Sequence, residues 1–320
     1  MQSVRLAVAE DLSAVNHIIV SSLRSKVGLV EEIGQYIVEA GGKRLRPVLA
    51  LLAANALNYN GDKHHYFAAV VEFIHTATLL HDDVVDVSSL RRGRPTANAE
   101  YGNASSVLVG DFIYTRAFQQ MVELDEPAIL PLMAQATNQI AEGEVLQLVQ
   151  AGQMSTTEEV YYDIINRKTA VLFEAACEGG GIIAGATSIQ RQALADFGRH
   201  LGMAFQIADD ILDYRGNAET MGKNVGDDLA EGKLTLPLIR LFTIGSPEQQ
   251  KLVSEAIEQR SAASIETIYD AVIATKSLDY CEFVAAQHAK NAATALDVLP
   301  DSDFRHQMQR LIDLAIHRDH

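Results

Sequence analysis

Three aspartates crowd into five residues at the end of the apolar run LLHDDVVD, as Asp82, Asp83 and Asp86. The same DDxxD spacing recurs further along the chain, as Asp209, Asp210 and Asp213. On a helix, residues four apart lie on one face, so each motif would place its first and last carboxylates together. Like charges at such range repel one another, whereas a hard divalent cation binds clustered carboxylate oxygens. Each motif therefore suggests a Mg²⁺ site with open positions for water or phosphate.

One DDxxD motif on a helix would most simply be a solvated face. Here there are two copies, each in an apolar context and each followed by basic residues. This repetition favours the metal interpretation. Two such helices facing one another would hold several Mg²⁺ ions, and a diphosphate would fit the gap between them.

Cationic and polar residues accompany both motifs and suggest two anion sites, one bridged by metal and one held directly. Arg suits phosphate because its planar fork donates two parallel hydrogen bonds. GGKRLRP is not a phosphate loop, because the GxxxxGK[ST] spacing is absent. The candidates are Lys43, Arg44, Arg46, His75, Arg91, Arg92, Arg94, Lys168, Thr169, Gln206, Lys223 and Lys233.

Composition narrows the class of protein. The chain has 320 residues and a formal net charge of −16, which disfavours nonspecific binding to nucleic acid or to an anionic membrane surface. The two cysteines, Cys177 and Cys281, form no CxxC pair, as is usual for a protein of the reducing cytoplasm. The N-terminal stretch suggests neither a signal peptide nor a membrane span.

The dominant hydrophobic period is helical, and strand-like alternation is scarce. We therefore predict a single all-α domain over residues 1–320, a bundle of long helices. Ser155 to Glu158 resembles a capping box, and Ser246-Pro247-Glu248 a cap with proline at the first helical position. The expected helical runs are 70–86, 107–122, 129–149, 157–176, 189–212, 234–242, 248–260, 264–275, 278–296 and 303–316.

The ordered set GGKRLRP, IHTATLLHDDVVDVSSLRRGRPT, RKT, FQIADDILD and GKLTLP resembles the motifs of trans-prenyl diphosphate synthases. The segments GDFIYTRAFQQM and IAEGEVLQL are most similar to those of bacterial members that make octaprenyl diphosphate. The resemblance implies the isoprenoid synthase fold, an all-α bundle around a deep central cavity, and a homodimer. It also implies condensation of isopentenyl diphosphate with an allylic diphosphate, farnesyl diphosphate being the expected starter.

The resemblance also assigns roles. Asp82, Asp83, Asp86, Asp209, Asp210 and Asp213 would bind two to three Mg²⁺ ions and, through them, the allylic diphosphate. Arg91, Lys168, Thr169, Gln206, Lys223 and Lys233 would contact that diphosphate directly, and Arg91, Lys168 and Lys223 count among the catalytic residues together with the metal-binding aspartates. Lys43, Arg46, His75 and Arg92 would hold isopentenyl diphosphate, with Arg44 in support.

Product length should depend on the helix wall before the first motif. Ala77 and Thr78 stand where short-chain members of the family often carry a bulky aromatic residue, so small residues there predict a long product. Met121 and Met133 are candidates for the floor of the tunnel, and ordinary core packing explains them equally well. Octaprenyl is the expected length, with products from geranylgeranyl to decaprenyl as alternatives and a quinone side chain as the expected use.

Two further hypotheses remain open. A terpene cyclase would use the same fold without an isopentenyl diphosphate site, and Lys43, Arg46, His75 and Arg92 count against it. A non-catalytic partner subunit would be expected to lack part of one aspartate motif, yet both are complete. The expected location is the cytoplasm, without integral membrane segments, although a peripheral contact with a membrane could serve product release.

Overall fold

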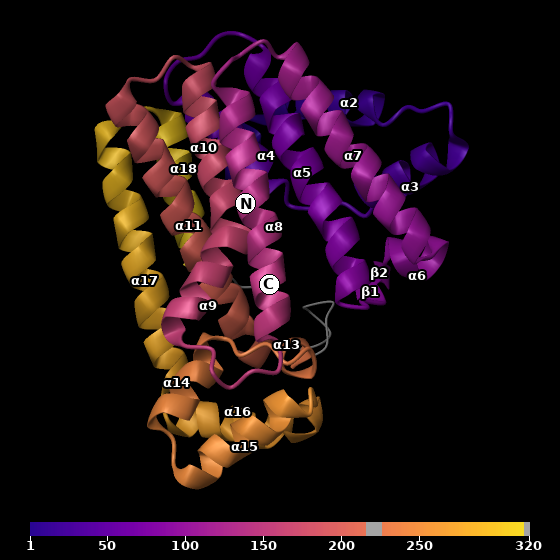
Figure 1. The fold of residues 1–320 in the computed structure, drawn as a ribbon. Coiled ribbons are helices and arrows are strands. Elements are labelled where there is room, and N and C mark those ends of the chain that lie inside the picture. The colour runs from indigo at the N-terminus through magenta and orange to yellow at the C-terminus, as the bar shows by residue number, and fades with distance from the viewer. Residues whose placement is uncertain (216–225, 317–320) are drawn as a thin grey trace. The chain divides into compact units, whose positions relative to one another are not determined.

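In the computed structural model, the chain is built almost wholly from helices, which confirms the all-α prediction. The structure describes residues 1–215 and 226–316 (Figure 1). Packing divides the chain into two units, and each is described by itself. The prediction of a single domain over 1–320 and that of a deep central cavity both stay predictions.

Unit 1 comprises residues 1–137, 172–198 and 293–311. Its centre is α5 (Lys63–Val85), which packs against α2, α4 and α7 and carries the first aspartate motif at its end (Figure 1). The other elements up to α7 are α1 (Gln2–Ala7), α2 (Ala9–Ser22), α3 (Gly28–Glu39), α4 (Leu45–Asn55), β1 (Leu90–Arg91), β2 (Arg94–Pro95), α6 (Ala97–Tyr101) and α7 (Asn103–Glu123).

The core of unit 1 follows from sequence. Helix α4 reads LRPVLALLAAN and is buried from Pro47 to its end, so it is enclosed on all sides rather than amphipathic. Helix α5 buries Phe67, Phe73 and Ile74 in its first four turns. Helix α5 also carries His64 and His65 in its first turn and the buried Glu72 in its middle, and its aspartates come at the C-terminal end.

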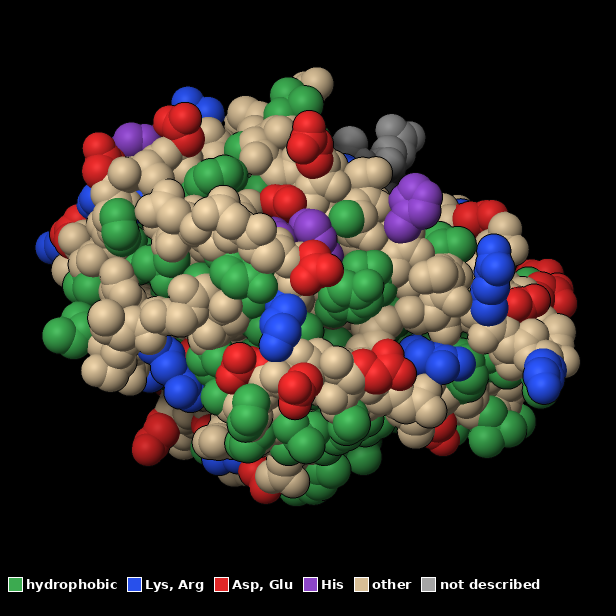
Figure 2. Space-filling model, turned by 90° about the horizontal axis from the view of Figure 1, so that it is seen from above, with side chains coloured by type: hydrophobic (Ala, Val, Ile, Leu, Met, Phe, Trp, Pro, Cys, Tyr) green, Lys and Arg blue, Asp and Glu red, His purple; other side chains and the backbone are tan. Residues whose placement is uncertain are grey.

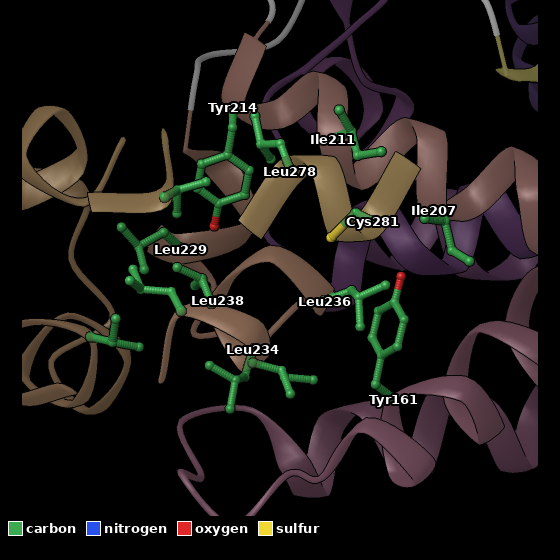
Figure 3. Packing of buried hydrophobic residues seen from close by; sticks show 14 of the residues in the cluster. Tyr161, Ile207, Ile211, Tyr214, Leu229, Leu234, Leu236, Leu238, Leu278 and Cys281 are labelled. Atoms are coloured by element: carbon green, nitrogen blue, oxygen red, sulfur yellow. The ribbon is translucent and has the colours of Figure 1, made fainter. Parts of the chain in front are cut away.

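Unit 2 comprises residues 138–171, 199–292 and 312–320. Wholly within it lie α9 (Glu158–Ile165), a π-helix (Asn166–Ala170), α13 (Asp227–Ala230), α14 (Leu236–Ile244), α15 (Pro247–Glu258), a 3₁₀ turn (Ala262–Ser264) and α16 (Ile265–Ala274). Its core is a cluster of aliphatic and aromatic side chains that includes Tyr161, Ile207, Tyr214 and Leu236 (Figure 3).

The remaining helices contribute residues to both units. They are α8 (Ile129–Gln150), α10 (Val171–Ile183), α11 (Ser188–Arg215), α17 (Ser277–Ala295) with the 3₁₀ turn Leu296–Val298, and α18 (Asp303–Ile316). No helix among the described residues is long and apolar enough to cross a membrane.

Helix boundaries test two predictions about capping. Ser246 does cap α15: its Oγ accepts from Gln249 N, the Gln249 side chain accepts from Ser246 N, and Pro247 is the first helical residue. The capping box predicted at Ser155 is wrong. Helix α9 is capped instead by Thr157, whose hydroxyl accepts from Val160 N, because the helix begins later, at Glu158.

Candidate functional site: two acidic helix ends and their cations

The first aspartate motif occupies the C-terminal end of α5. The helix ends at Val85, Asp86 is the cap residue, and its N–H donates to the carbonyl of Asp82 at 2.8 Å. Asp82 and Asp86 are partly exposed, as expected for one helix face, while Asp83 is buried. A helix C-terminus carries partial negative charge, so carboxylates there are unfavourable unless cations compensate them. The helix end is therefore electrostatically suited to bind cations.

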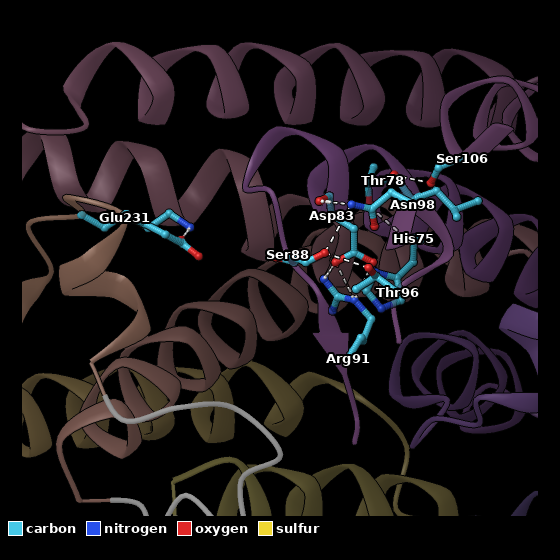
Figure 4. Close-up of polar contacts among 11 residues, drawn as sticks. His75, Thr78, Asp83, Ser88, Arg91, Thr96, Asn98, Ser106 and Glu231 are labelled. Carbon is cyan, nitrogen blue, oxygen red and sulfur yellow. Dashed lines mark hydrogen bonds and ion pairs between the residues drawn. The ribbon is translucent and has the colours of Figure 1, made fainter. Parts of the chain in front are cut away.

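Arg91 supplies one of those cations from the protein itself. Its Nε lies 3.0 Å from both carboxylate oxygens of Asp83, and its terminal nitrogen donates to Oδ1 at 2.7 Å. Figure 4 shows this pair below the end of the helix. The motifs predict a metal ion at Asp83 and a diphosphate at Arg91, whereas in the structure the two side chains bind each other.

A short hairpin positions Arg91. Strands β1 and β2 pair antiparallel, and the two turn residues, Arg92 and Gly93, both have positive φ, of 54° and 74°. Two successive positive φ angles fit a type I′ hairpin turn, and an arginine in the left-handed region is strained. The Asn98 amide donates to the carbonyls of Asp83 and Ser88, and Thr96 donates to Ser88 at 2.7 Å, which fixes the hairpin against α5 (Figure 4).

The residues predicted to hold isopentenyl diphosphate gather around His75. Arg46 lies 3.2 Å from His75 Nε2 and stacks over the Phe173 ring at 4.7 Å. Burial lowers the pKa of His75 well below its usual value, and the charges of Arg46, Arg92, Arg91 and Arg44 lower it further. Burial and the neighbouring Arg91 also lower the pKa of Arg92. The cluster is thus a neutral imidazole among guanidinium groups, a strongly positive environment for an anion.

Two details add to this cluster. Arg44, in the left-handed region at the start of α4, forms an ion pair with the buried Glu72. The Arg92 guanidinium lies so close to Gly42 that a Cβ there would come within 2.8 Å of it. Gly42 of GGKRLRP therefore leaves room for an arginine, and Lys43 is exposed beside it.

In unit 2, the second motif lies near the end of α11, with Asp209 exposed and both Asp210 and Asp213 buried. Asp210 accepts from the Tyr161 hydroxyl at 2.6 Å and from the Gln206 amide at 2.8 Å. Burial raises the pKa of Asp210 above its ordinary value, and the carboxylates of Asp228 and Asp209 raise it further. This concentration of negative charge would be relieved by a bound cation.

Lys168 and Thr169 belong to the five-residue π-helix, where the sequence suggested one uninterrupted α-helix. Lys168 forms an ion pair with Glu144 at 2.8 Å, and the Thr169 hydroxyl donates to Gln206 at 2.9 Å. Thr169, Gln206, Asp210 and Tyr161 therefore form one continuous hydrogen-bonded chain. Inserted π-turns are frequent at functional sites because they turn side chains out of the regular helical register.

Gly143 on α8 makes the π-helix possible at this distance. A Cβ at Gly143 would lie 2.7 Å from Arg167 Cβ and 3.0 Å from the backbone nitrogen of Lys168. Only glycine allows this approach without a shift of one of the two helices. Lys233 forms an ion pair with Glu231 in the same unit, which Figure 4 also draws. Lys223 lies outside the described residues.

The chain-length candidates fall into two groups. Ala77, Met121 and Met133 are fully or almost fully buried, which fits core packing and a tunnel wall equally. Thr78 is partly exposed, and its hydroxyl donates to the carbonyl of His75 at 2.8 Å. Their role therefore stays a prediction.

Sequence reasoning missed several supporting residues, namely Glu72, Asn98, Gly143, Glu144, Tyr161 and Asp228. Only Asp228 could have been found by local spacing, because it belongs to a third pair of adjacent aspartates, in NVGDDLAEGK. In that segment only Lys233 is among the candidates named from the sequence. The others are isolated residues whose partners lie far along the chain, so no local spacing reveals them.

Comparison with known proteins identifies the family of the chain. Residues 27–272 match the model of the polyprenyl synthetase family. The chain is 50% identical to octaprenyl diphosphate synthase of Escherichia coli over 100% of this chain and 99% of that protein. It is 46% identical to the geranyl-diphosphate-specific all-trans-nonaprenyl-diphosphate synthase of Rhodobacter capsulatus, over 99% of this chain and 98% of that one.

A crystal structure of a polyprenyl synthase from Caulobacter crescentus, complexed with calcium and isoprenyl diphosphate, superposes with a TM-score of 0.95. It is 42% identical in sequence and covers 98% of this chain and 97% of that one. The isoprenoid synthase fold that the motifs implied is therefore confirmed. The chain belongs to the polyprenyl synthetase family and is a polyprenyl diphosphate synthase, a prenyltransferase.

Proposed function

We propose that this chain extends farnesyl diphosphate with isopentenyl diphosphate until the product is octaprenyl diphosphate. Membership of the family supports the proposed class of reaction, because prenyl synthases join these two kinds of diphosphate. The 50% identity to the Escherichia coli octaprenyl diphosphate synthase along the whole chain supports the proposed length of the product. The nonaprenyl synthase at 46% identity makes nine units the nearest alternative.

The residues of the two motifs fit divalent metal. Their donors are all carboxylate oxygens, which suit Mg²⁺ rather than a softer ion. Both motifs lie near helix C-termini, where carboxylates are unfavourable without a cation, and burial together with the neighbouring carboxylates raises the pKa of Asp210. We propose that Asp82, Asp83, Asp86, Asp209, Asp210 and Asp213 hold two to three Mg²⁺ ions. When bound, these ions would neutralise the negative charge of a diphosphate leaving group.

The remaining residues would bind and orient the substrates. Arg91, Lys168, Thr169, Gln206, Lys223 and Lys233 are proposed to contact the allylic diphosphate, and Lys43, Arg46, His75 and Arg92 isopentenyl diphosphate. Fixed cations stabilise charge as it develops on the departing diphosphate, so the allylic C–O bond ionises. The double bond of isopentenyl diphosphate attacks the resulting cation, and a proton then passes to the released diphosphate. Apolar walls exclude water, which would otherwise quench the cation.

Incubation of the purified chain with Mg²⁺, farnesyl diphosphate and radiolabelled isopentenyl diphosphate tests this proposal. The expected product is labelled octaprenyl diphosphate, identified by chromatography after removal of the phosphates. Unlabelled cyclic hydrocarbon would instead indicate a cyclase. Product that forms only after a second protein is added would indicate a partner subunit, and labelled nonaprenyl diphosphate would correct the length alone.

We further propose a homodimer in the cytoplasm, each copy folding as one domain over residues 1–320. A membrane would be met only through a peripheral contact during product release. Analytical ultracentrifugation across a tenfold range of protein concentration tests the assembly, because a monomer at every concentration contradicts it.

A further inference from the structure

Asp11, His64 and His65 form a cluster that plays no part in the prenyl transfer. Asp11 lies in the first turn of α2, and the two histidines lie in the first turn of α5. Among the residues that the structure describes, these three side chains each place a ligand atom within 4.8 Å of the others. On the face seen in Figure 2, histidine side chains lie against acidic ones.

The distances match those between ligands of one metal ion. The Nε2 atoms of His65 and His64 lie 2.9 and 3.5 Å from the same oxygen, Asp11 Oδ1. Tetrahedral Zn²⁺ with bonds of about 2.0–2.1 Å separates its ligand atoms by about 3.3 Å, so the observed distances fall on either side of that value. Two imidazoles and one carboxylate favour Zn²⁺ and similar transition metals over Mg²⁺ or Ca²⁺.

Neighbouring groups hold the cluster in place. Asn55, the last residue of α4, donates to the other carboxylate oxygen, Asp11 Oδ2, at 2.7 Å, which leaves Oδ1 directed at the histidines. The imidazole rings are nearly stacked, with centroids 4.0 Å apart, and Tyr59 packs edge-on against His64 at 5.2 Å. Outer groups of this kind orient metal ligands and raise affinity.

The two histidines contact the Asp11 carboxylate unequally. The nearby imidazoles of His64 and His65 and the Asn55 amide hold the pKa of Asp11 well below its usual range, against the opposing effect of burial. The 3.5 Å separation from His64 Nε2 is long for a hydrogen bond, and His64 Nδ1 has no hydrogen-bond partner in the part of the chain described. Asp11 Oδ1 is therefore a closer hydrogen-bond partner for His65 than for His64.

We propose that Asp11, His64 and His65 form a second metal site, for one zinc-class ion, that ties the N-terminal helix α2 to the start of α5. From His64 to Asp82 the helix rises about 27 Å, so the site is distinct from the aspartate motifs on the same helix. Its role is structural, because it fixes the end of the helix that carries Asp82, Asp83 and Asp86. One position remains open for water.

The test is Co²⁺ binding to metal-stripped full-length protein, with excess Mg²⁺ present to occupy the aspartate motifs. Tetrahedral Co²⁺ bound by imidazole has strong visible absorption. The wild-type chain should bind one more Co²⁺ than Asp11→Asn or the double variant His64→Gln/His65→Gln, and Zn²⁺ should displace it. Asn55→Ala should weaken binding about 10–100-fold without abolishing it. Zn²⁺ should raise the melting temperature of the wild-type chain but not that of Asp11→Asn or of the double variant.

His306→Gln is the matched control, because His306 pairs with Asp301 at 3.1 Å but belongs to no group of three metal-ligating side chains among the described residues. It should bind Co²⁺ as the wild type does. Asp11→Asn changes one atom and keeps the shape of the cluster, so its folding can be verified by circular dichroism. Equal Co²⁺ stoichiometry in wild type and folded Asp11→Asn would overturn the proposal and leave a cluster held by hydrogen bonds alone.

Discussion

Arg91 binds the buried carboxylate of Asp83 through three donor–acceptor contacts of 2.7–3.0 Å. The second aspartate of the first motif is therefore neutralised by the protein itself, whereas Asp82 and Asp86 remain on the more accessible side of the helix end. Because Asp83 is fixed, it can hold both the hairpin and the last turn of α5 in place. One carboxylate of the motif then organises the site, and the other two face outward.

Replacing Arg91 with lysine should separate geometry from charge. Lysine keeps the positive charge but loses the planar fork, so Asp83 keeps at most one of its contacts. We expect the free energy of unfolding in urea to fall by about 1–3 kcal/mol, as for a buried group left partly unsatisfied, and turnover to fall with it. Arg94→Lys is the control, since Arg94 stacks on Tyr36 instead. Equal effects of the two substitutions would show that the paired geometry is unimportant.

Removing the accessible carboxylates should abolish catalysis without unfolding the chain. Asp82→Ala and Asp209→Ala each delete a proposed metal ligand that is at least partly exposed, so little packing is lost. We expect turnover to drop by orders of magnitude while the helical circular dichroism is unchanged. The exposed Asp313 on α18 provides the control Asp313→Ala. Near-normal turnover in either motif variant contradicts the metal assignment.

Much of the fold could be predicted from the sequence, because long amphipathic helices show a hydrophobic periodicity of three to four residues. The run predicted over 303–316 coincides with α18, and that over 129–149 differs from α8 by one residue. The predicted run over 157–176 is interrupted by a π-helix, which the sequence did not indicate. A π-turn adds only one residue to a helix, and this changes the hydrophobic pattern too little to be recognised. It also missed the hairpin around Arg92, because two-residue strands are too short for any periodicity to appear.

Candidate site residues could be identified from the sequence where spacing carries the chemistry, as with the two DDxxD motifs, whose metal-binding role stays a proposal. They could not be identified where one residue supports another from a distant segment. Tyr161 and Asp210 are 49 residues apart, and nothing near Tyr161 marks it as a donor to a proposed metal-binding carboxylate. Similarly, an ion pair between Arg91 and Asp83 depends on the turn between them, and the side-chain types alone do not reveal it.

The stability of the chain should depend on pH through His75. Its pKa lies below the ordinary 6.5 in the folded state, so the unfolded chain binds the proton more readily. The contribution of neutral His75 is fully present above about pH 6.5 and is lost as the pH falls toward the folded pKa. The slope from this one group is at most about 1.4 kcal/mol per pH unit. The measurement is urea unfolding of the wild type and His75→Gln between pH 7.5 and 5.5.

We expect the wild type to lose more stability than His75→Gln across that range. His288 acts in the same direction, with its folded pKa lowered to about 4 by burial and by His200, so His288→Gln should also flatten the curve. His17, exposed on α2, supplies the control His17→Gln. Parallel curves for wild type and His75→Gln would show that His75 is not buried among the arginines in solution.

Product length should respond to bulk at Thr78. This residue lies one turn before Asp82, about 6 Å along the helix, which is close to the length of one isoprene unit. Thr78→Phe should therefore stop elongation early and give geranylgeranyl diphosphate or another short product in place of octaprenyl diphosphate. Ala77→Phe should act similarly, but because Ala77 is wholly buried it should also destabilise the fold by about 1–3 kcal/mol.

Thr115→Phe, at an exposed position of α7, controls for the added ring. Chromatography of dephosphorylated products gives the length distribution. A distribution that stays at the wild-type length in folded Thr78→Phe would place the growing hydrocarbon along another wall.

The π-helix gives the last prediction, through Gly143. Alanine is normally the better helix former by about 1 kcal/mol, so Gly143→Ala would stabilise an unobstructed helix. Here the added Cβ would meet Arg167 Cβ at 2.7 Å and Lys168 N at 3.0 Å, and backbone atoms cannot rotate away. We expect the clash to prevail, with a net loss of about 1–3 kcal/mol in urea unfolding. Turnover should fall as well, because Lys168 and Thr169 would be displaced from Glu144 and Gln206.

Gly28→Ala is the matched control, since nothing lies within 4 Å of a Cβ there. If Gly143→Ala proves as stable and active as Gly28→Ala, the close approach of α8 does not position Lys168.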